Sequence, residues 1–164
     1  MKKISIYCDG GSRGNPGPGA VAFVVLENGK IIYKFSKRIG KTTNNVAEYQ
    51  AVIEALGWVV SSRSGYKGGG EKWEVSQEVR SEKKEPTSHL SSSPQIHFFL
   101  DSQLVVNQLN GRFKIKDAKL RSLIIQTRAL EQKVDRKIFY HLISRRQNKI
   151  ADTLINQSLN AVSR

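Results

Sequence analysis

The sequence predicts an α/β fold in which a mixed β-sheet is flanked by helices. Three β-rich segments follow one another within the first 40 residues, and turn residues join them. The apolar spacing then changes to that of a helix, and strands alternate with helices from residue 96 onward. A meander followed by strand–helix alternation gives a sheet with antiparallel and parallel parts. Of the 164 residues, 38% are hydrophobic, which is enough to form a core.

The first three strands are predicted from alternation and turn chemistry. Residues 3–9 alternate and are rich in β-forming side chains, so they predict a strand. Residues 10–19 consist mainly of Gly, Pro, Ser and Asn, which predicts a turn. Residues 20–27 predict a second strand, and Asn28-Gly29 is a strong two-residue hairpin signal. Residues 30–39 then predict a third strand, which completes an antiparallel meander.

The remaining elements are predicted from helical spacing and short apolar runs. Thr43-Asn44-Asn45 offers an N-cap, and apolar residues at helical spacing continue to about Val60. Asn110-Gly111 is a typical helix stop. The later elements, in chain order, are a strand at 96–100, helices at 102–109 and 118–133, a strand at 137–143 and a helix at 148–161.

Residues 61–95 differ in composition from the rest of the chain. They hold nine Ser, four Gly and two Pro, with Lys and Glu interleaved. This composition predicts a flexible insertion, which a domain tolerates because loop entropy rises slowly with length. We expect a single domain over residues 1–164 that carries this insertion at about 61–95.

The charge balance indicates a polyanionic partner. The chain has 27 Lys and Arg against 14 Asp and Glu, a formal net charge of +13. Residues 101–164 alone hold 13 basic and 5 acidic side chains, whereas the insertion is nearly neutral. A solvated surface accounts for a balanced set of charges better than for this one-sided excess.

Other features of the sequence bear on the cellular compartment of the protein. The sequence contains no run of about 18 apolar residues, so we expect no membrane span. Its first residues turn polar at once, which is unlike a signal peptide. The single Cys8 excludes an intramolecular disulfide framework and a Cys-based zinc cluster. We therefore expect a cytoplasmic protein, and we expect it to be a monomer.

Four carboxylates are the candidate functional groups. Asp9 ends the first predicted strand and Asp101 the fourth, and such strand ends face the ligand crevice of an open sheet. Glu48 and Asp152 each lie about one turn into a helix. Taken one at a time, these acids also fit a turn, a helix cap or a surface charge.

Four carboxylates that converged on one point would raise one another's pKa unless cations neutralised them. Oxygen ligands suit Mg²⁺ or Mn²⁺. Carboxylate-held metal pairs acting on a polyanion perform phosphodiester hydrolysis.

The segments that carry these carboxylates match a known pattern in order and spacing. They are Tyr7-Cys8-Asp9-Gly10-Gly11-Ser12 with Asn15-Pro16-Gly17, then Thr42-Thr43-Asn44-Asn45-Val46-Ala47-Glu48, then Leu100-Asp101-Ser102-Gln103-Leu104-Val105, and last Arg145-Arg146-Gln147-Asn148-Lys149-Ile150-Ala151-Asp152. Together they resemble the motifs of the type 1 ribonuclease H family, and the resemblance covers residues 1–60 and 96–160.

The resemblance implies a ribonuclease H-like fold, with a five-stranded mixed sheet whose first three strands are antiparallel. It implies an endonuclease that hydrolyses the RNA strand of RNA–DNA hybrids, leaving 5′-phosphate and 3′-hydroxyl ends. It also implies two Mg²⁺ ions, with Mn²⁺ as an active substitute. The family positions that are catalytic and hold the metals correspond to Asp9, Glu48, Asp101 and Asp152.

The resemblance also assigns substrate contacts. The residues at family positions that sense the RNA 2′-hydroxyl are Gly10, Gly11, Ser12, Asn15, Asn44, Asn45 and Gln103. Amide side chains both donate and accept hydrogen bonds, which suits a hydroxyl group. Thr43 resembles the residue that holds a DNA phosphate, while Asn44 also fits a helix N-cap.

Two departures from the family pattern stand out. The stretch 110–116 is too short for the basic helix and loop of many members, although it is itself basic. Loop 144–148 has no histidine, and Arg145 or Arg146 is a candidate substitute. Phe113 is expected to fill a core gap rather than stack on a sugar.

Two other functions remain open at this point. One is a non-catalytic module that binds hybrids, which the charge and the missing histidine would allow. The other is a related nuclease that acts on double-stranded RNA or DNA junctions with the same fold.

Overall fold

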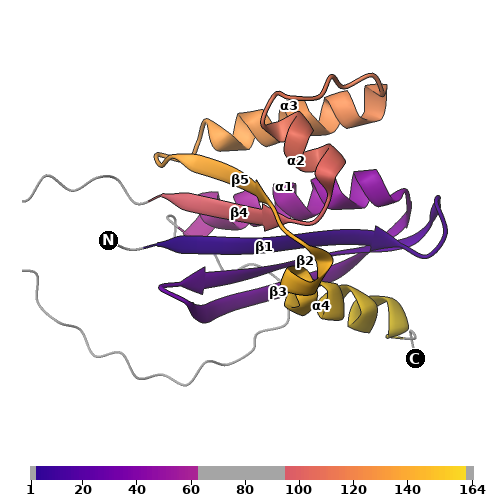
Figure 1. Ribbon diagram of the computed structural model, residues 1–164. Helices are drawn as coiled ribbons and strands as arrows, with labels where there is room; N and C mark the ends of the chain where they lie inside the picture. Colours follow the sequence, from indigo (N-terminus) through magenta and orange to yellow (C-terminus); the bar gives the residue numbers. More distant parts are fainter. Residues whose placement is uncertain (1–2, 63–94, 162–164) are drawn as a thin grey trace, which may run out of the picture.

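The computed structural model describes residues 3–62 and 95–161, drawn in colour in Figure 1. The predicted flexible insertion at about 61–95 lies, apart from its ends, outside the described residues. The strands are β1 (Ile4–Ser12), β2 (Gly17–Glu27), β3 (Lys30–Thr42), β4 (Ile96–Leu100) and β5 (Ile138–Leu142). The helices are α1 (Asn44–Ser62), α2 (Gln103–Leu109), α3 (Ala118–Glu131), the 3-10 helix η1 (Arg145–Asn148) and α4 (Lys149–Asn160).

The five strands form one mixed sheet in the order β3-β2-β1-β4-β5. Strand β2 pairs antiparallel with both β1 and β3, whereas β4 pairs parallel with β1 and β5. The predicted fold class, with its antiparallel meander, is therefore confirmed. The parallel pairing brings the carboxyl ends of β4 and β5 to the same edge as the carboxyl half of β1.

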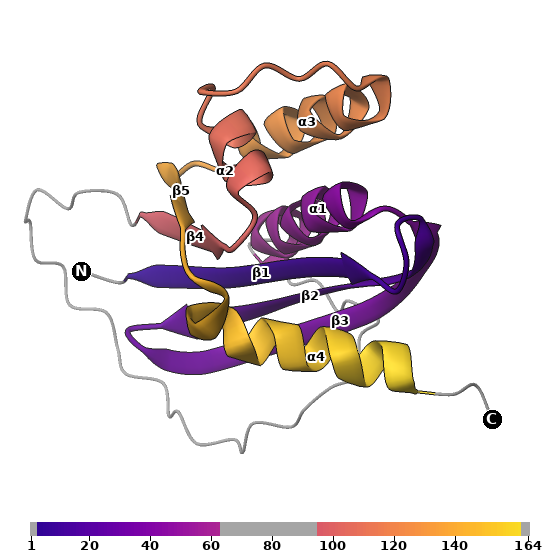
Figure 2. The ribbon, with the colours of Figure 1, turned by 45° about the vertical axis from the view of Figure 1, so that its right-hand side comes forward.

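Helices cover the two faces of the sheet unequally. Helices α1, α2 and α3 lie on one side, and α4 alone lies on the other (Figures 1 and 2). The main core fills the space between α1 and the sheet, and it includes the fully buried Tyr49, Leu56 and Phe98. On the other side, Ile155 of α4 packs against Ala20 and Ala22 of β2 in a small second cluster. None of the described helices is long and apolar enough to cross a membrane.

The first two strands are longer than the sequence predicts. Strand β1 continues through Gly10 to Ser12, and β2 begins at Gly17, so the turn shrinks to residues 13–16. Gly10 belongs in the strand because β1 passes very close to helix α1. A Cβ atom on Gly10 would lie 2.1 Å from the backbone carbonyl carbon of Ala47. This close approach places Asp9, the residue before Gly10, beside Glu48, the residue after Ala47.

Candidate active site

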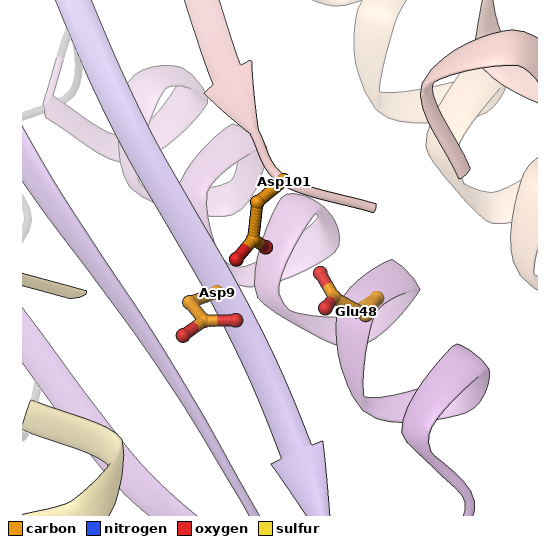
Figure 3. A group of neighbouring side chains, drawn as sticks. All are labelled: Asp9, Glu48 and Asp101. Carbon is orange, nitrogen blue, oxygen red and sulfur yellow. The ribbon is translucent and has the colours of Figure 1, made fainter. Parts of the chain in front are cut away.

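The close approach of β1 and α1 brings three carboxylates together (Figure 3). Asp9 comes from β1, Glu48 from the first turns of α1, and Asp101 directly follows β4. Each offers an oxygen, and the three oxygens lie within 4.8 Å of one another. Three of the four predicted carboxylates therefore form one tight group in the described part of the chain, and Asp152 is the fourth.

The fold disfavours the charged forms of two of these groups. Asp9 is 5% exposed and Glu48 is 9% exposed. Burial, followed by the charges of Asp101 and Asp152, raises the pKa of Asp9 from its ordinary value of 3.8 to about 7. Burial and the charges of Asp9 and Asp101 raise the pKa of Glu48 well above its usual range. Glu48 Oε2 has no hydrogen-bond partner among the described residues. On balance, the surroundings of Asp9 and Glu48 thus disfavour their negative charges.

Asp152 lies at the edge of the same cleft, outside the tight group. It is in the first turn of α4, on the other side of the sheet from Glu48. Its Oδ1 atom is 3.5 Å from Nη2 of Arg145, and its Oδ2 atom accepts a 3.4 Å hydrogen bond from Asn156. Because its charge raises the pKa of Asp9, it acts on the cluster through space.

Arg145 is the cation that faces the acidic cluster. Its charge lowers the pKa of both Asp9 and Glu48, against the larger effect of burial. It belongs to the 3-10 turn η1, where the family pattern has a histidine loop. An arginine offers a planar, permanently cationic donor group at this position, which differs chemically from the histidine of the family pattern.

The four carboxylates line one open cleft of about 640 Å³. Five of the eight predicted substrate contacts line it as well, namely Gly10, Gly11, Ser12, Asn44 and Gln103. The other three, Asn15, Thr43 and Asn45, are not part of this lining. The open cleft therefore holds the four carboxylates together with five of the predicted contact residues.

Two of these three residues, Asn15 and Thr43, make hydrogen bonds that hold the start of α1 in place. Asn15 Oδ1 accepts a 3.0 Å hydrogen bond from the backbone N–H of Asn44. Asn44 Oδ1 in turn accepts from the backbone N–H of Ser12 at 2.9 Å, and from its hydroxyl at 3.0 Å. The Asn44 oxygen is thus committed, and its NH₂ group remains to donate. Thr43 Oγ1 accepts from the N–H of Val46 and caps α1, so the alternative that Asn44 is the cap is wrong.

Asn148 is a site residue that sequence reasoning missed. It is 1% exposed, and its side-chain NH₂ donates a 2.8 Å hydrogen bond to the carbonyl oxygen of Cys8. This bond ties the start of α4, which carries Asp152, to the residue before Asp9. Only its place in the fourth motif marks it in the sequence.

Arg13 and the loop after α2 make further contacts near the cleft that the sequence does not predict. Arg13 donates to the Leu159 carbonyl at 3.4 Å and to the Asn160 side chain, so it holds the end of α4 against the β1–β2 turn. Phe113 is 45% exposed, so the expectation that it fills a core gap is wrong. The N–H groups of Arg112 and Phe113 both donate to Asn107, which bends the loop over the end of α2.

Known proteins match nearly the whole chain. A family model described as RNase H matches residues 1–67, and one described as reverse transcriptase-like matches residues 91–158. A bifunctional protein of Mycobacterium tuberculosis is 33% identical over 163 residues, which are 98% of this chain and 36% of that protein. Ribonuclease HI of Halobacterium salinarum is 32% identical over 158 residues, which are 96% of this chain and 64% of the relative. The chain thus spans about a third of the length of the first of these relatives.

Solved structures match over almost their full length. The crystal structure of RNase H1 from Halobacterium salinarum has a TM-score of 0.74 and 31% identity, covering 98% of this chain and 99% of that one. LC11-RNase H1, solved in complex with an RNA/DNA hybrid, has a TM-score of 0.76 and 29% identity, covering 96% and 97%. Sheet order and acidic cluster define the class of ribonuclease H-like domains. Within that class, the chain belongs to the type 1 ribonuclease H family.

Proposed function

We propose that this protein is an endoribonuclease that hydrolyses the RNA strand of RNA–DNA hybrids and leaves 5′-phosphate and 3′-hydroxyl ends. The observation that carries the proposal is the group of three carboxylates within 4.8 Å, set in an open cleft. Family membership supports the reaction, and the hybrid bound to LC11-RNase H1 supports the substrate class. The net charge of +13 suits a duplex polyanion.

The residues present fit divalent metal ions. All the donors are carboxylate oxygens, which Mg²⁺ and Mn²⁺ prefer. The unpartnered Glu48 Oε2 and the raised pKa values of Asp9 and Glu48 mark a site that a cation would stabilise. We infer that Asp9, Glu48, Asp101 and Asp152 hold two ions. When bound, these would supply the activated water and stabilise the leaving 3′-oxygen.

The other cleft residues bind and orient the substrate in this proposal. The Gly10–Ser12 segment lines the cleft, and the NH₂ of Asn44 offers a donor to a 2′-hydroxyl, which DNA lacks. Gln103 adds an amide that both donates and accepts. Arg145 favours the ionised forms of Asp9 and Glu48, because its charge opposes the effect of burial on their pKa values.

The remaining assignments concern three substrate contacts outside the cleft lining, the oligomeric state and the cellular compartment. We assign Thr43 to a DNA phosphate, and Asn15 and Asn45 to contacts that sense the RNA 2′-hydroxyl. We also propose that the protein acts as a monomer in the cytoplasm. The buried, unpaired thiol of Cys8 is compatible with a reducing compartment.

A panel of duplexes tests the proposal. Purified protein in Mg²⁺ should cut the RNA strand of a blunt hybrid and leave double-stranded DNA intact. Efficient cleavage of double-stranded RNA or of DNA junctions would favour a related nuclease of the same fold. Tight, salt-sensitive hybrid binding with no cleavage in either Mg²⁺ or Mn²⁺ would instead favour a binding module.

A further inference from the structure

Five aromatic and histidine rings form one continuous stack across β1, β4 and β5. Their centroid separations are 4.9 Å for Tyr7–Phe99, 5.0 Å for Phe99–His141, 5.1 Å for His141–His97 and 5.1 Å for His97–Phe139. The two histidines also share a 2.9 Å hydrogen bond between Nδ1 of His97 and Nε2 of His141. We call these five residues the aromatic face.

The aromatic face lies on the side of the sheet away from α1. Side chains alternate along a strand, and the neighbouring Ile6, Phe98 and Tyr140 are buried in the core on the α1 side. On the other side, α4 packs on β1, β2 and β3, as Figure 2 shows. The rings on β4 and β5 stay partly exposed, and Phe139 reaches 38%. A row of rings in this position is not needed to seal the core.

The aromatic face continues directly into the catalytic cleft. Tyr7 is two residues before Asp9, and Phe99 is two residues before Asp101, so each ring shares a side of the sheet with a carboxylate. Two residues of strand span about 7 Å and four span about 13 Å. Stacked nucleotides rise about 3.4 Å each along one strand. About two to four nucleotides leaving the cleft would therefore cover the aromatic face.

The charges around the aromatic face are positive. By the same alternation, Lys3 and Lys137 share its side of the sheet, and the backbone of Lys137 still pairs with Ile96. Lys3 is close enough that its charge, after burial and His141, lowers the pKa of His97. Among the described residues at alternating positions on β1, β4 and β5, the acids on this side are Asp9 and Asp101.

We propose that the aromatic face binds an unpaired nucleic-acid strand that continues from the hybrid in the cleft. The proposal rests on the proposed function and adds a second contact surface to it. Aromatic rings beside cationic side chains are the chemistry of single-strand binding, because bases stack on rings while phosphates contact the charges. Strand β5 is an edge strand, so no further strand of the described sheet lies beside Phe139 and His141. Duplex bases are already stacked, which makes an unpaired strand the occupant.

Overhangs on a hybrid test this directly. The Asp101→Asn protein, used to prevent cleavage, is titrated in Mg²⁺ into labelled hybrids and followed by fluorescence anisotropy. The hybrids are blunt, or carry four unpaired nucleotides on either strand at either end, or carry the same overhang without bases. We expect one overhang to tighten binding at least about 5-fold over the blunt hybrid, and the base-free overhang to give no such gain.

Variants of Phe139 locate the contact. In the same background, Phe139→Ala and the bulk-retaining Phe139→Leu should both abolish the gain and leave blunt-hybrid binding unchanged. Ile125→Ala is the matched control, because Ile125 is an exposed apolar residue of α3 on the opposite side of the sheet. It should keep the gain.

Each alternative result has a clear meaning. No gain from any overhang, an equal gain without bases, or a gain retained in both Phe139 variants would overturn the proposal. If wild-type protein cuts the blunt hybrid while overhangs give no gain, the aromatic face alone is refuted. If the blunt hybrid is neither bound nor cut, the proposed function has failed as well.

Discussion

Replacing Asp9 by Asn removes a negative charge that the folded protein disfavours. Folding raises the pKa of Asp9 from 3.8 to about 7, and each pKa unit corresponds to about 1.36 kcal/mol. Below pH 3.8 the carboxyl is protonated in both states, so its burial carries no charge penalty. The penalty grows as pH rises, to about 1.6 kcal/mol at pH 5, and levels off near 4 kcal/mol above pH 7. We therefore expect Asp9→Asn to be more stable than wild type at pH 8 and similar at pH 4.

Urea unfolding followed by circular dichroism in EDTA, from pH 4 to pH 8, measures this difference. Asp117→Asn is a matched control, since Asp117 caps α3 at an exposed position where Asn caps equally well. Adding Mg²⁺ should stabilise wild type and narrow the gap, because the ion binds the folded state. An Asp9→Asn protein no more stable than wild type at pH 8 would refute the electrostatic reasoning.

Three further predictions follow from the packing around the cleft. Gly10→Ala should lower the urea midpoint strongly, because its Cβ would meet the backbone of Ala47, whereas Gly57→Ala, in open space on α1, should raise stability by about 0.5–1 kcal/mol. Equal effects of the two changes would contradict this packing. Asn148→Ala should cost about 1–3 kcal/mol in urea unfolding and lower kcat more than it raises KM, since it removes the buried hydrogen bond to the Cys8 carbonyl that positions the start of α4 against β1. Unchanged kcat would argue against a positioning role. Arg145→Ala should move the acid limb of the pH–rate profile to higher pH, because the Arg145 charge lowers the pKa of Asp9 and Glu48, and Arg145→Lys should restore it. An unmoved limb would count against this coupling.

The sequence predicts the order of the strands and helices well, because each has a strong local pattern. The antiparallel meander follows from alternation and from Asn28-Gly29, and the helices follow from apolar spacing. The prediction is wrong where glycines indicate a turn inside a strand. Gly11 pairs with Ala20 and Ser12 with Gly19 across β1 and β2, and Gly10 in the same strand is packed against α1, a tertiary contact that no local pattern encodes.

Part of the candidate site can also be predicted from the sequence, where a residue stands out from its neighbours. Asp9, Glu48 and Asp101 stand out as isolated acids in a basic chain, and the fold brings them together. Asn148 has no such signal, since a polar residue before a helix is ordinary and only tertiary contact buries it against Cys8. The rings of the aromatic face are likewise far apart in sequence, and the parallel pairing of β4 with β1 and β5 makes them neighbours.

Cleavage of a blunt RNA–DNA hybrid in Mg²⁺ by wild type and by Asp101→Asn tests the central claim most directly. A single-turnover assay with end-labelled RNA measures the rate and identifies the product ends. We expect wild type to cut the RNA strand to 5′-phosphate and 3′-hydroxyl ends, and Asp101→Asn to be at least about 100-fold slower, since it lacks one of the proposed metal ligands. Intact RNA with the folded wild-type protein, or equal rates for the two proteins, would contradict the account.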